Sequence, residues 1–546
     1  MRTFLITLSL LALIATGACR RGNVSDAVTL ALPESFSTLD TLTSPGSDVA
    51  SDRLRTIIFN TLVRKNENFE YVGELASNIT SSEDNKVIAF TLRDNVKFHN
   101  GNELTSADVK YTFDELFKSN SFKSKAFFDT VPADQKGAEP DPAKGPASAN
   151  SQPQQNPGGA AKTRAVPHIL SIETPDPKTV IFTVARPALN NQLLSNLVAI
   201  PIIPAGTVAQ QKEQPIGTGP YKFVSFDQAQ NIVELAAHPD YWEGAPEVAR
   251  LRVKTVKDAN SLAAELQTGG VDIAPNPSNL PPDSIKSLGS NPNLKVEQTD
   301  GSNIQYLVFN TQSPPLNNVK VRQAIGFAVD REKIINELLL NQAKVAHSVL
   351  PTQSWAYTPG RQYTYDPERA RQLLEDAGYK DEPIVFKYGS GSAMVNQYAQ
   401  AIQSSLSQAG LNVRIETLDR QIIIDQLNKG QVQMFTGIWV GGNQDPIFLR
   451  DLFSSARIPG GTVGCCNRSR YVNREVDQLV EEAINTTDRN QADALYGRVW
   501  EIVSEDVPLL PLWYPANIVV ANRRVGDIKI SPSGDWSFVK NITLQK

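Results

Sequence analysis

The side chains that most often carry enzyme chemistry are few and scattered in this sequence. It has only 4 histidines and 3 cysteines. The histidines are His99, His168, His238 and His347. They are too far apart in sequence to form a ligand cluster, and three cysteines cannot supply a four-thiolate metal site. Two hydrolase motifs, Gly-x-Ser-x-Gly and His-Glu-x-x-His, are also missing. We therefore expect no catalytic residue, no metal and no cofactor.

One cysteine is placed for covalent modification. Arg2 supplies a positive charge, residues 4–14 form an apolar run too short to span a bilayer, and Thr16-Gly17-Ala18-Cys19 follows. This ending resembles a bacterial lipobox, in which the cysteine is lipidated and becomes the mature N-terminus, although Thr16 stands where leucine is usual. The sequence predicts a signal peptide over 1–18, then a lipidated Cys19 and a tether over 19–27. The protein would then lie in the periplasm or at the cell surface, held to a bacterial membrane by its lipid alone. Simple secretion is the alternative.

The other two cysteines, Cys465 and Cys466, are adjacent. They could form a vicinal disulfide or stay reduced. Because residues 460–469 have the composition of an exposed loop, we favour a local structural role for this pair over redox chemistry.

Composition limits the class of partner. The chain has 546 residues, 53 Lys+Arg against 58 Asp+Glu, and 40% hydrophobic residues. At about 150 residues per domain, this length predicts three or four domain-sized units with real cores. A net charge of -5 is too small to indicate a nucleic-acid partner.

The elements that must position a site alternate in type. A capping box at Thr105-Ser106-Ala107-Asp108 starts a helix in the first half. In the second half, Asp366-Pro367 begins a helix that Gly378 ends, and a strand over 384–388 follows. This alternation predicts an α/β fold. Residues 133–163 are rich in Pro, Ala, Gly and Gln, and they predict a disordered surface insertion.

Several segments together resemble the family 5 extracellular solute-binding proteins of ABC importers, the group of dipeptide, oligopeptide and nickel binders. The matching segments occur in the family's order along nearly all of the mature chain. They are the run from Phe90 to Gly101, Leu104-Thr105-Ser106-Ala107-Asp108-Val109, Gly217-Thr218-Gly219-Pro220-Tyr221, Pro239-Asp240-Tyr241-Trp242, Gly270-Val271-Asp272-Ile273, Phe309-Asn310-Thr311, Val321-Arg322-Gln323-Ala324 with Asp330-Arg331, the Asp366 helix, Asp445-Pro446 and Leu452-Phe453-Ser454-Ser455.

The resemblance implies a periplasmic-binding-protein-like clamp of two lobes (type II, cluster C) with an extra subdomain on the first lobe. We assign the lobe 1 core to residues 28–48, 179–273 and 508–546. The subdomain takes residues 49–178, and lobe 2 takes 274–507. In such a fold a ligand held by both lobes favours closure, which a permease can read as occupancy.

The ligand site departs from the pattern of peptide-binding relatives. Those relatives place an aspartate in a Trp-x-x-Asp stretch before the Asp-Pro pair, where it meets the peptide's amino terminus; this chain has Gly442 there. Some dipeptide binders also place an arginine after the strand that matches 384–388, where this chain has Gly389-Ser390-Gly391-Ser392-Ala393. A buried unpaired charge costs several kcal/mol, so a dipeptide held by its charged termini is disfavoured.

The remaining residues around this stretch predict a neutral cleft. We expect Trp439 and Trp355 as apolar walls and Asn443 as a hydrogen-bonding group, with a core role as the alternative for Trp355. Ser44, Gly46 and Ser47 form the expected first-lobe contact, since small residues let the backbone approach. Asp445 could bind an amine or cap a helix.

The sequence therefore predicts a monomeric solute-binding lipoprotein that captures a peptide or another small solute and delivers it to ABC permease and ATPase subunits. The same clamp used as a sensor or chaperone-like lipoprotein is one alternative. An exported hydrolase is the other.

Overall fold

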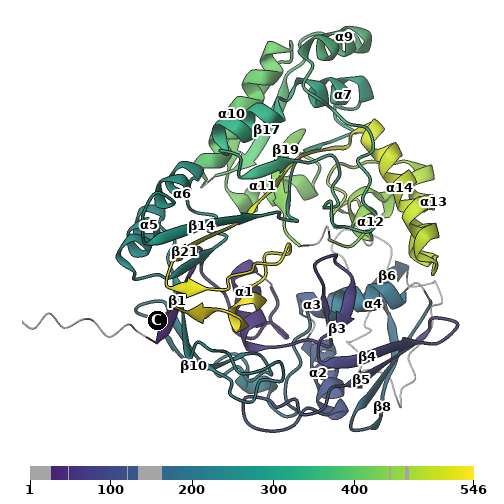
Figure 1. Ribbon diagram of the computed structural model, residues 1–546. Helices are drawn as coiled ribbons and strands as arrows, with labels where there is room; N and C mark the ends of the chain where they lie inside the picture. The colour runs from purple at the N-terminus through teal and green to yellow at the C-terminus, as the bar shows by residue number, and fades with distance from the viewer. Residues whose placement is uncertain are drawn as a thin grey trace, which may run out of the picture.

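The computed structural model of the chain describes residues 26–46, 48–119, 121–132, 163–187, 189–390, 392–441, 444–460 and 466–545. The predicted signal peptide, Cys19 and nearly all of the 133–163 insertion lie outside these ranges. The described elements form two lobes, one above the other in Figure 1. None of the helices within the described residues is long and apolar enough to cross a membrane.

The first lobe is built on a seven-stranded sheet with the order β10-β11-β12-β1-β13-β21-β14. Its two faces follow the period of two of its strands. Val28, Leu30 and Leu32 of β1 face one core, which includes α1, and Ala31 faces a second core with α5 and α6. The strands are β1 (Ala27–Leu32), β10 (Tyr221–Asp227), β11 (Ile232–Ala237), β12 (Arg250–Thr255), β13 (Ile273–Pro275), β14 (Leu294–Thr299) and β21 (Asn517–Asn522), and the helices are α1 (Val49–Ile58), α5 (Ala259–Thr268) and α6 (Pro282–Leu288).

A four-stranded sheet, β4-β5-β9-β8, shares the first lobe's core. Helix α2 (Ser106–Ser119) packs on it, with the Phe113 ring 5.1 Å from that of Phe182. The predicted capping box is confirmed, because Asp108 accepts hydrogen bonds from the Thr105 backbone N–H at 2.9 Å and from its hydroxyl at 2.8 Å. The strands are β4 (Ala76–Ser81), β5 (Val87–Leu92), β8 (Ile169–Asp176) and β9 (Thr179–Val184).

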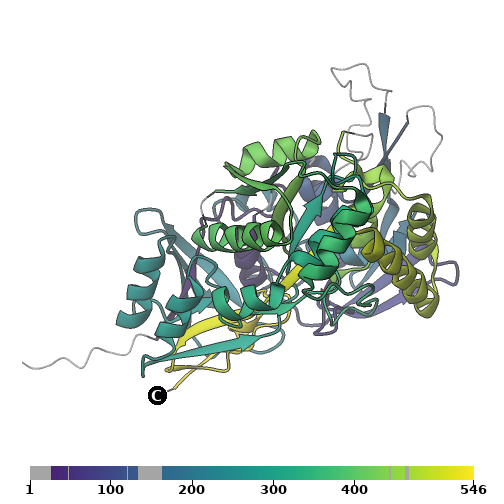
Figure 2. The ribbon, with the colours of Figure 1, turned by 90° about the horizontal axis from the view of Figure 1, so that it is seen from above.

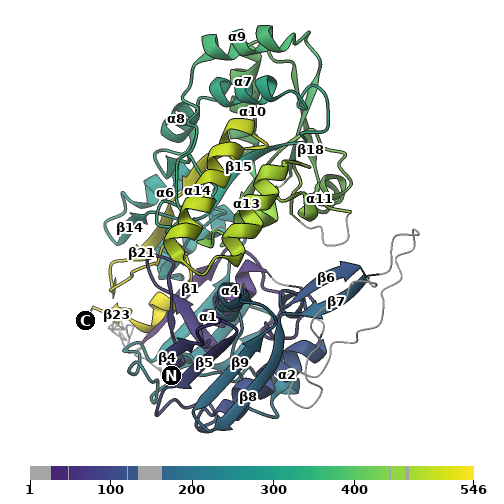
Figure 3. The same cartoon turned by 90° about the vertical axis from the view of Figure 1, so that its right-hand side faces the viewer.

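The second lobe is built on a six-stranded sheet with the order β16-β20-β15-β19-β17-β18. All residues of the central strand β15 are buried, as expected for a strand covered on both faces. Its Leu307 and Phe309 face α7, α9 and α10, whereas Tyr306 and Val308 face the side of α12, α13 and α14. Figure 3 shows α13 and α14 in front. The strands are β15 (Ile304–Phe309), β16 (Ala343–Val345), β17 (Ile384–Gly389), β18 (Val413–Leu418), β19 (Met434–Trp439) and β20 (Leu509–Pro515). The helices are α7 (Val319–Ala328), α9 (Pro367–Ala377), α10 (Ala393–Gln408), α11 (Arg420–Asn428), α12 (Phe448–Phe453), α13 (Arg474–Asn485) and α14 (Arg489–Asp506).

The chain passes from one sheet to the other at residues that differ from the lobe boundaries predicted from the sequence. Strand β14 pairs with β21 in the first sheet, although residues 274–507 were assigned to lobe 2; Figure 2 shows these two strands side by side, with the C-terminal one in yellow. Strand β20 pairs in the second sheet, although 508–546 was assigned to lobe 1, and β9 joins the four-stranded sheet. Only Ala516 separates β20 from β21, so the sequence pattern looks like one continuous strand. In the structure the two halves pair in different sheets.

The lobes are joined by two crossings, residues 300–303 and residue 516. They run close together, because a Cβ on Gly301 would lie 2.1 Å from the Pro515 carbonyl oxygen. Only glycine fits at this position. The Asn517 side chain ties the crossing to the C-terminal loop by donating to the carbonyls of Ser531 and Pro532, at 3.0 and 3.1 Å.

Candidate functional site

The segment predicted to bind ligand follows β19 and begins at its carboxyl end. We call the described residues of this segment, 439–441 with 444 and 445, the 439–445 turn. Gly441 has a φ of 77°, which favours glycine, and its N–H donates to the Asn303 side chain at 3.3 Å. The turn therefore starts against the crossing that joins the lobes. Gly442 and Asn443 lie outside the described residues.

The first lobe reaches this turn through a hairpin made of β2 (Val63–Lys65) and β3 (Tyr71–Gly73). The Lys65 ammonium donates to Oε1 of Gln444 at 3.3 Å, and the Tyr71 hydroxyl donates to Oδ2 of Asp445. Figure 1 places β3 directly below α12. These contacts join residues of the two lobes that are more than three hundred positions apart in sequence.

Gln444 connects three parts of the molecule. It is buried, and its Nε2 donates to the Ser302 hydroxyl at 3.0 Å. Its other amide atom accepts from Lys65, as described above. One side chain thus joins the turn to the crossing through Ser302 and to the first lobe through Lys65.

Asp445 uses both of its carboxylate oxygens within the protein. Oδ1 accepts from the Ile447 N–H at 2.9 Å, which closes the turn that leads into α12, and Oδ2 accepts from Tyr71. Of the two roles predicted for Asp445, these contacts resemble the cap more than an open amine site.

We call the contact between the β2–β3 hairpin and the 439–445 turn the junction. Its charged groups are partnered within the protein. Burial lowers the pKa of the Lys65 ammonium, and the nearby Asp445 carboxylate opposes that effect. Burial, together with the same carboxylate, raises the pKa of the Tyr71 phenol well above its usual range. Tyr71 therefore keeps its proton and remains a donor at neutral pH.

The two predicted tryptophan walls lie near this junction on different elements. Trp439 is partly buried against Phe448, with ring centroids 4.9 Å apart. Trp355 packs edge-on against Tyr496 at 6.0 Å, and the Arg489 guanidinium lies 5.1 Å from its ring. Arg489 also donates to Glu70 of the hairpin segment at 3.0 Å.

The loop predicted as the first-lobe contact is not bonded to the 439–445 turn through its described residues. Ser44 is half-buried and Gly46 is exposed in the loop before α1, where a Cβ on Gly46 would meet nothing within 4 Å. Within the described part of the chain, no hydrogen bond joins Ser44 or Gly46 to the 439–445 turn. Ser47 lies outside that part. The residues that do make the first-lobe contact, Lys65 and Tyr71, carried no motif in the sequence.

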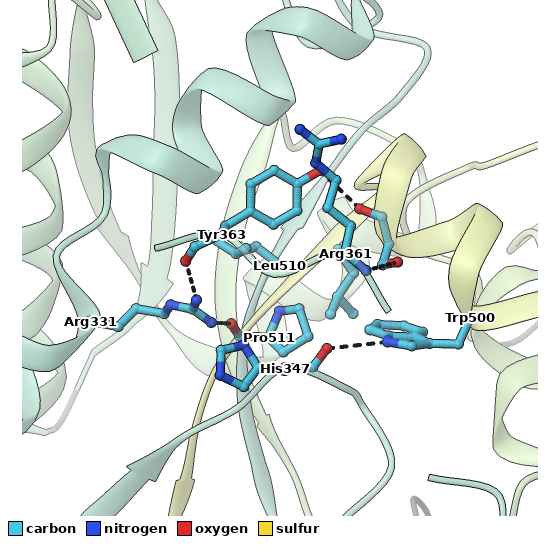
Figure 4. A pocket seen from close by; sticks show the side chains of 9 residues that line it. Arg331, His347, Arg361, Tyr363, Trp500, Leu510 and Pro511 are labelled. Carbon is cyan, nitrogen blue, oxygen red and sulfur yellow. Dashed lines mark hydrogen bonds between the residues drawn. The ribbon is translucent and has the colours of Figure 1, made fainter. Parts of the chain in front are cut away.

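The second lobe also encloses a small cavity, shown in Figure 4. The Arg331 guanidinium on its wall donates to the carbonyls of Ala346, Pro511 and Tyr363, and Trp500 donates to the His347 carbonyl at 3.2 Å. The space is about 10 Å³, which holds one water molecule at most. It is core packing and has no room for a peptide.

The cysteine and histidine interpretations can be compared with the structure in part. Cys466 is disulfide-bonded, so the reduced alternative is wrong for this residue. Its partner is outside the described residues, as Cys19 and Cys465 both are. His99 is held by backbone groups, with Gly217 N–H donating to its Nδ1 at 3.3 Å and its Nε2 at 3.0 Å from the Gly219 carbonyl. This arrangement suits a structural histidine.

Comparisons with known proteins agree with this architecture. Residues 70–460 match the model of the bacterial extracellular solute-binding proteins, family 5. The chain is 29% identical over 490 residues to the probable D,D-dipeptide-binding periplasmic protein DdpA of Escherichia coli, covering 87% of this chain and 85% of that protein. It is 28% identical over 509 residues to Heme-binding protein A of Haemophilus influenzae, covering 88% and 86%.

A solved structure with the same fold is the oligopeptide-binding protein AppA from Bacillus subtilis in complex with a nonapeptide. It is 23% identical, with a TM-score of 0.71 over 95% of this chain and 99% of that one. The family match spans both lobes and the 439–445 turn. The chain belongs to family 5 of the bacterial extracellular solute-binding proteins.

Proposed function

We propose that this protein captures a peptide or peptide-like solute between its two lobes, outside the cytoplasm, and delivers it to the permease and ATPase subunits of an ABC importer. The family is one of solute-binding proteins, and DdpA and AppA are described as peptide-binding. The observation that carries the proposal is the contact of Lys65 and Tyr71 with the 439–445 turn. A solute held there touches both lobes, so its binding energy favours the closed arrangement.

The chemistry of the junction favours a solute whose charged ends do not form ion pairs with the protein. Lys65 lies beside Asp445, and Arg489 is paired with Glu70. Both of these cations therefore have an opposite charge from the protein beside them. A free ammonium or carboxylate of a solute would have to displace one of these partners.

Two exposed aliphatic side chains support an apolar contact. Ile438 and Val440 are 49% and 46% exposed on either side of Trp439. Large apolar side chains that open to solvent at the carboxyl end of a strand are typical of a ligand surface. We propose that they contact apolar groups of the solute.

A direct test compares free and blocked peptides on the mature protein. Solute that co-purifies is released by denaturation and identified by mass spectrometry, and the emptied protein is then titrated with one peptide series in two forms. One form has free termini, and the other is N-acetylated and C-amidated. We expect the blocked form to raise the melting temperature at least as much as the free form. Binding of the free form alone would contradict the uncharged site.

We also propose that Cys19 is lipidated and that the protein acts as a monomer. The Thr16-Gly17-Ala18-Cys19 motif supports the first part. Cell fractionation tests it, since Cys19→Ala should move the protein from the membrane fraction to the soluble extracytoplasmic fraction. Light scattering of the detergent-solubilised protein tests the second part.

A further inference from the structure

A second cavity in the second lobe lies beside Trp439. It is bounded by the six-stranded sheet, by α12 and by the loop before α13. The residues that line it are mostly apolar and include Tyr306, Trp439, Leu452, Phe453, Arg468 and Leu509. Trp439 pairs with Ile304, the first residue of β15 after the crossing 300–303. The cavity therefore lies next to the place where the lobes are joined.

This cavity matches the one in Figure 4 in size but differs in how its arginine is bonded. Each space is about 10 Å³, which is room for one oxygen-sized group. In the first cavity, Arg331 donates to three backbone carbonyls. In the second, Nε of Arg468 is buried and has no hydrogen-bond partner, and this residue forms no ion pair within the described part of the chain. The second cavity thus has a donor without an acceptor.

The acidic residue of the neighbouring helix α12 is already used. Asp451 pairs with Arg450 at 3.2 Å and with Arg457 at 3.6 Å. A partly buried cation among apolar side chains loses hydration, and without an acceptor or a counter-ion that loss is not compensated. A water molecule at Nε of Arg468 would accept one hydrogen bond but would leave the charge unmatched. An oxyanion supplies both the acceptor and the charge.

The loop that carries Arg468 is held in place by its neighbours. Asn467 is fully buried, and its Nδ2 donates to the carbonyls of Ser454 and Tyr471 at 3.0 and 2.9 Å. Its Oδ1 accepts from the Ser469 hydroxyl at 2.8 Å. The residues on both sides of Arg468 are therefore fixed by bonds of their own. Little ordering of this loop is required when a ligand binds, which favours affinity.

We propose that Arg468 binds a carboxylate of the solute at this cavity, next to an apolar part of the solute that lies on Trp439. This inference rests on the proposed function and narrows the solute to a peptide with an acidic side chain. A carboxylate is the acceptor that best matches a guanidinium. The cavity takes one oxygen of the group, and the rest of the side chain stays outside it. The ends of the peptide remain unpaired, because this carboxylate belongs to a side chain.

The test compares two peptides on the emptied mature protein, Leu-Glu-Leu and Leu-Gln-Leu, both N-acetylated and C-amidated. They differ only in the carboxylate. By calorimetric titration we expect wild type to bind the Glu peptide about tenfold more tightly, because a charge-assisted hydrogen bond is gained. Arg468→Met should bind both peptides equally, at the affinity of the Gln peptide. Arg474→Met removes the same charge from an exposed position at the start of α13 and should keep the tenfold preference.

Two further measurements separate this site from a structural role and from failure of the proposed function. The melting temperature of the emptied protein should not fall in Arg468→Met, because the variant removes a cation without a partner. Butyrate needs no peptide site, and at matched ionic strength it should raise the melting temperature of wild type more than butyramide does. That difference should be absent in Arg468→Met.

The outcomes are distinct. Equal affinity of wild type for the two peptides would overturn the inference, as would a preference for the Glu peptide that persists in Arg468→Met. A lower melting temperature of Arg468→Met together with weaker binding of both peptides would assign Arg468 a structural role instead. If wild type binds neither peptide, the proposed function fails and butyrate decides alone. A butyrate shift that is lost in Arg468→Met then supports the anion site, and no shift, or an equal one, overturns it.

Discussion

Arg331 and Lys65 are both cations that the fold removes from water, but their partners lie in different places. Arg331 is 5% exposed, and the three carbonyls that accept from it all belong to the second lobe. Lys65 belongs to the first lobe, whereas its partners Gln444 and Asp445 belong to the second. Burial lowers the pKa of Arg331 to about 10, and burial also lowers that of Lys65.

The difference lies in what each cation stabilises. Arg331 holds together segments that never separate in the folded protein, so its bonds contribute to the free energy of unfolding. The bonds of Lys65 are made only when the lobes meet, and water can replace them when the lobes part. The comparison therefore predicts that cations within a lobe affect stability, while those between lobes affect binding.

The largest effect is expected from Arg331→Met. The variant leaves the carbonyls of Ala346, Pro511 and Tyr363 without their donor inside the core, and such losses cost about 3 kcal/mol or more. The free energy of unfolding from a urea titration measures this loss. Arg369→Met, at an exposed position of α9, is the control and should change it by less than about 0.5 kcal/mol. A loss below 1 kcal/mol in Arg331→Met would show that these three bonds do not stabilise the second lobe.

His99 is a second group whose contacts lie within one lobe, and its titration should change the free energy of unfolding of the protein. Burial lowers the pKa of His99 from 6.5 to about 3, so the folded protein keeps this imidazole neutral. In the unfolded chain it takes up a proton below about pH 6.5, and stability falls as the pH drops from there toward 3. After discounting for partial exposure, we expect a loss of about 2 kcal/mol by pH 4.5.

Urea titrations at several pH values in wild type and His99→Gln check this prediction. The slope of unfolding free energy against pH between about 6.5 and 4.5 should be shallower in the variant. His238, whose ring lies 5.0 Å from that of His99, provides a second variant, because burial also lowers its pKa. Equal slopes in wild type and His99→Gln would show that this group does not link the fold to pH.

Lys65→Met is expected to show the opposite pattern. The solute should dissociate about tenfold faster, while the unfolding free energy changes by less than about 1 kcal/mol. Both quantities are measured on the same preparation, dissociation by native mass spectrometry and stability by urea. A stability loss as large as that of Arg331→Met would mean that the lobes form one rigid unit and that the distinction between the two cations is wrong.

The sequence predicted the helix caps and turns, which are local, and missed the contacts between residues far apart in the chain. The helix from Asp366-Pro367 to Gly378 is confirmed, with Asp366 accepting from Arg369 N–H and Gly378 in the left-handed region at φ 66°. Caps and turns of this kind depend on residues a few positions apart, so the sequence displays them.

The junction depends on pairs that the sequence does not mark. Tyr71 and Asp445 are 374 positions apart, and no periodicity connects a tyrosine in a short hairpin with a carboxylate after a distant strand. The exchange between β20 and β21 was missed for a related reason, since strand partners come from tertiary packing. The family resemblance brought attention to residues 439–445, but only the fold shows that the first lobe contacts them through Lys65 and Tyr71.

The smallest effect is expected from Glu70→Gln, which removes the outermost of the three hairpin contacts. Glu70 and Arg489 pair at 3.0 Å, but their side chains are 41% and 54% exposed, so water and salt screen the attraction. Solute dissociation should change by less than about twofold, since exposed ion pairs contribute little to the contact, and the small difference should vanish at high salt. Measuring Glu70→Gln beside Lys65→Met at low and high salt therefore distinguishes the exposed ion pair of the hairpin from its buried contact. If Glu70→Gln speeds dissociation tenfold at both salt concentrations, then mere contact between the lobes controls binding. The specific hold of Lys65 and Tyr71 on the 439–445 turn would then not be required.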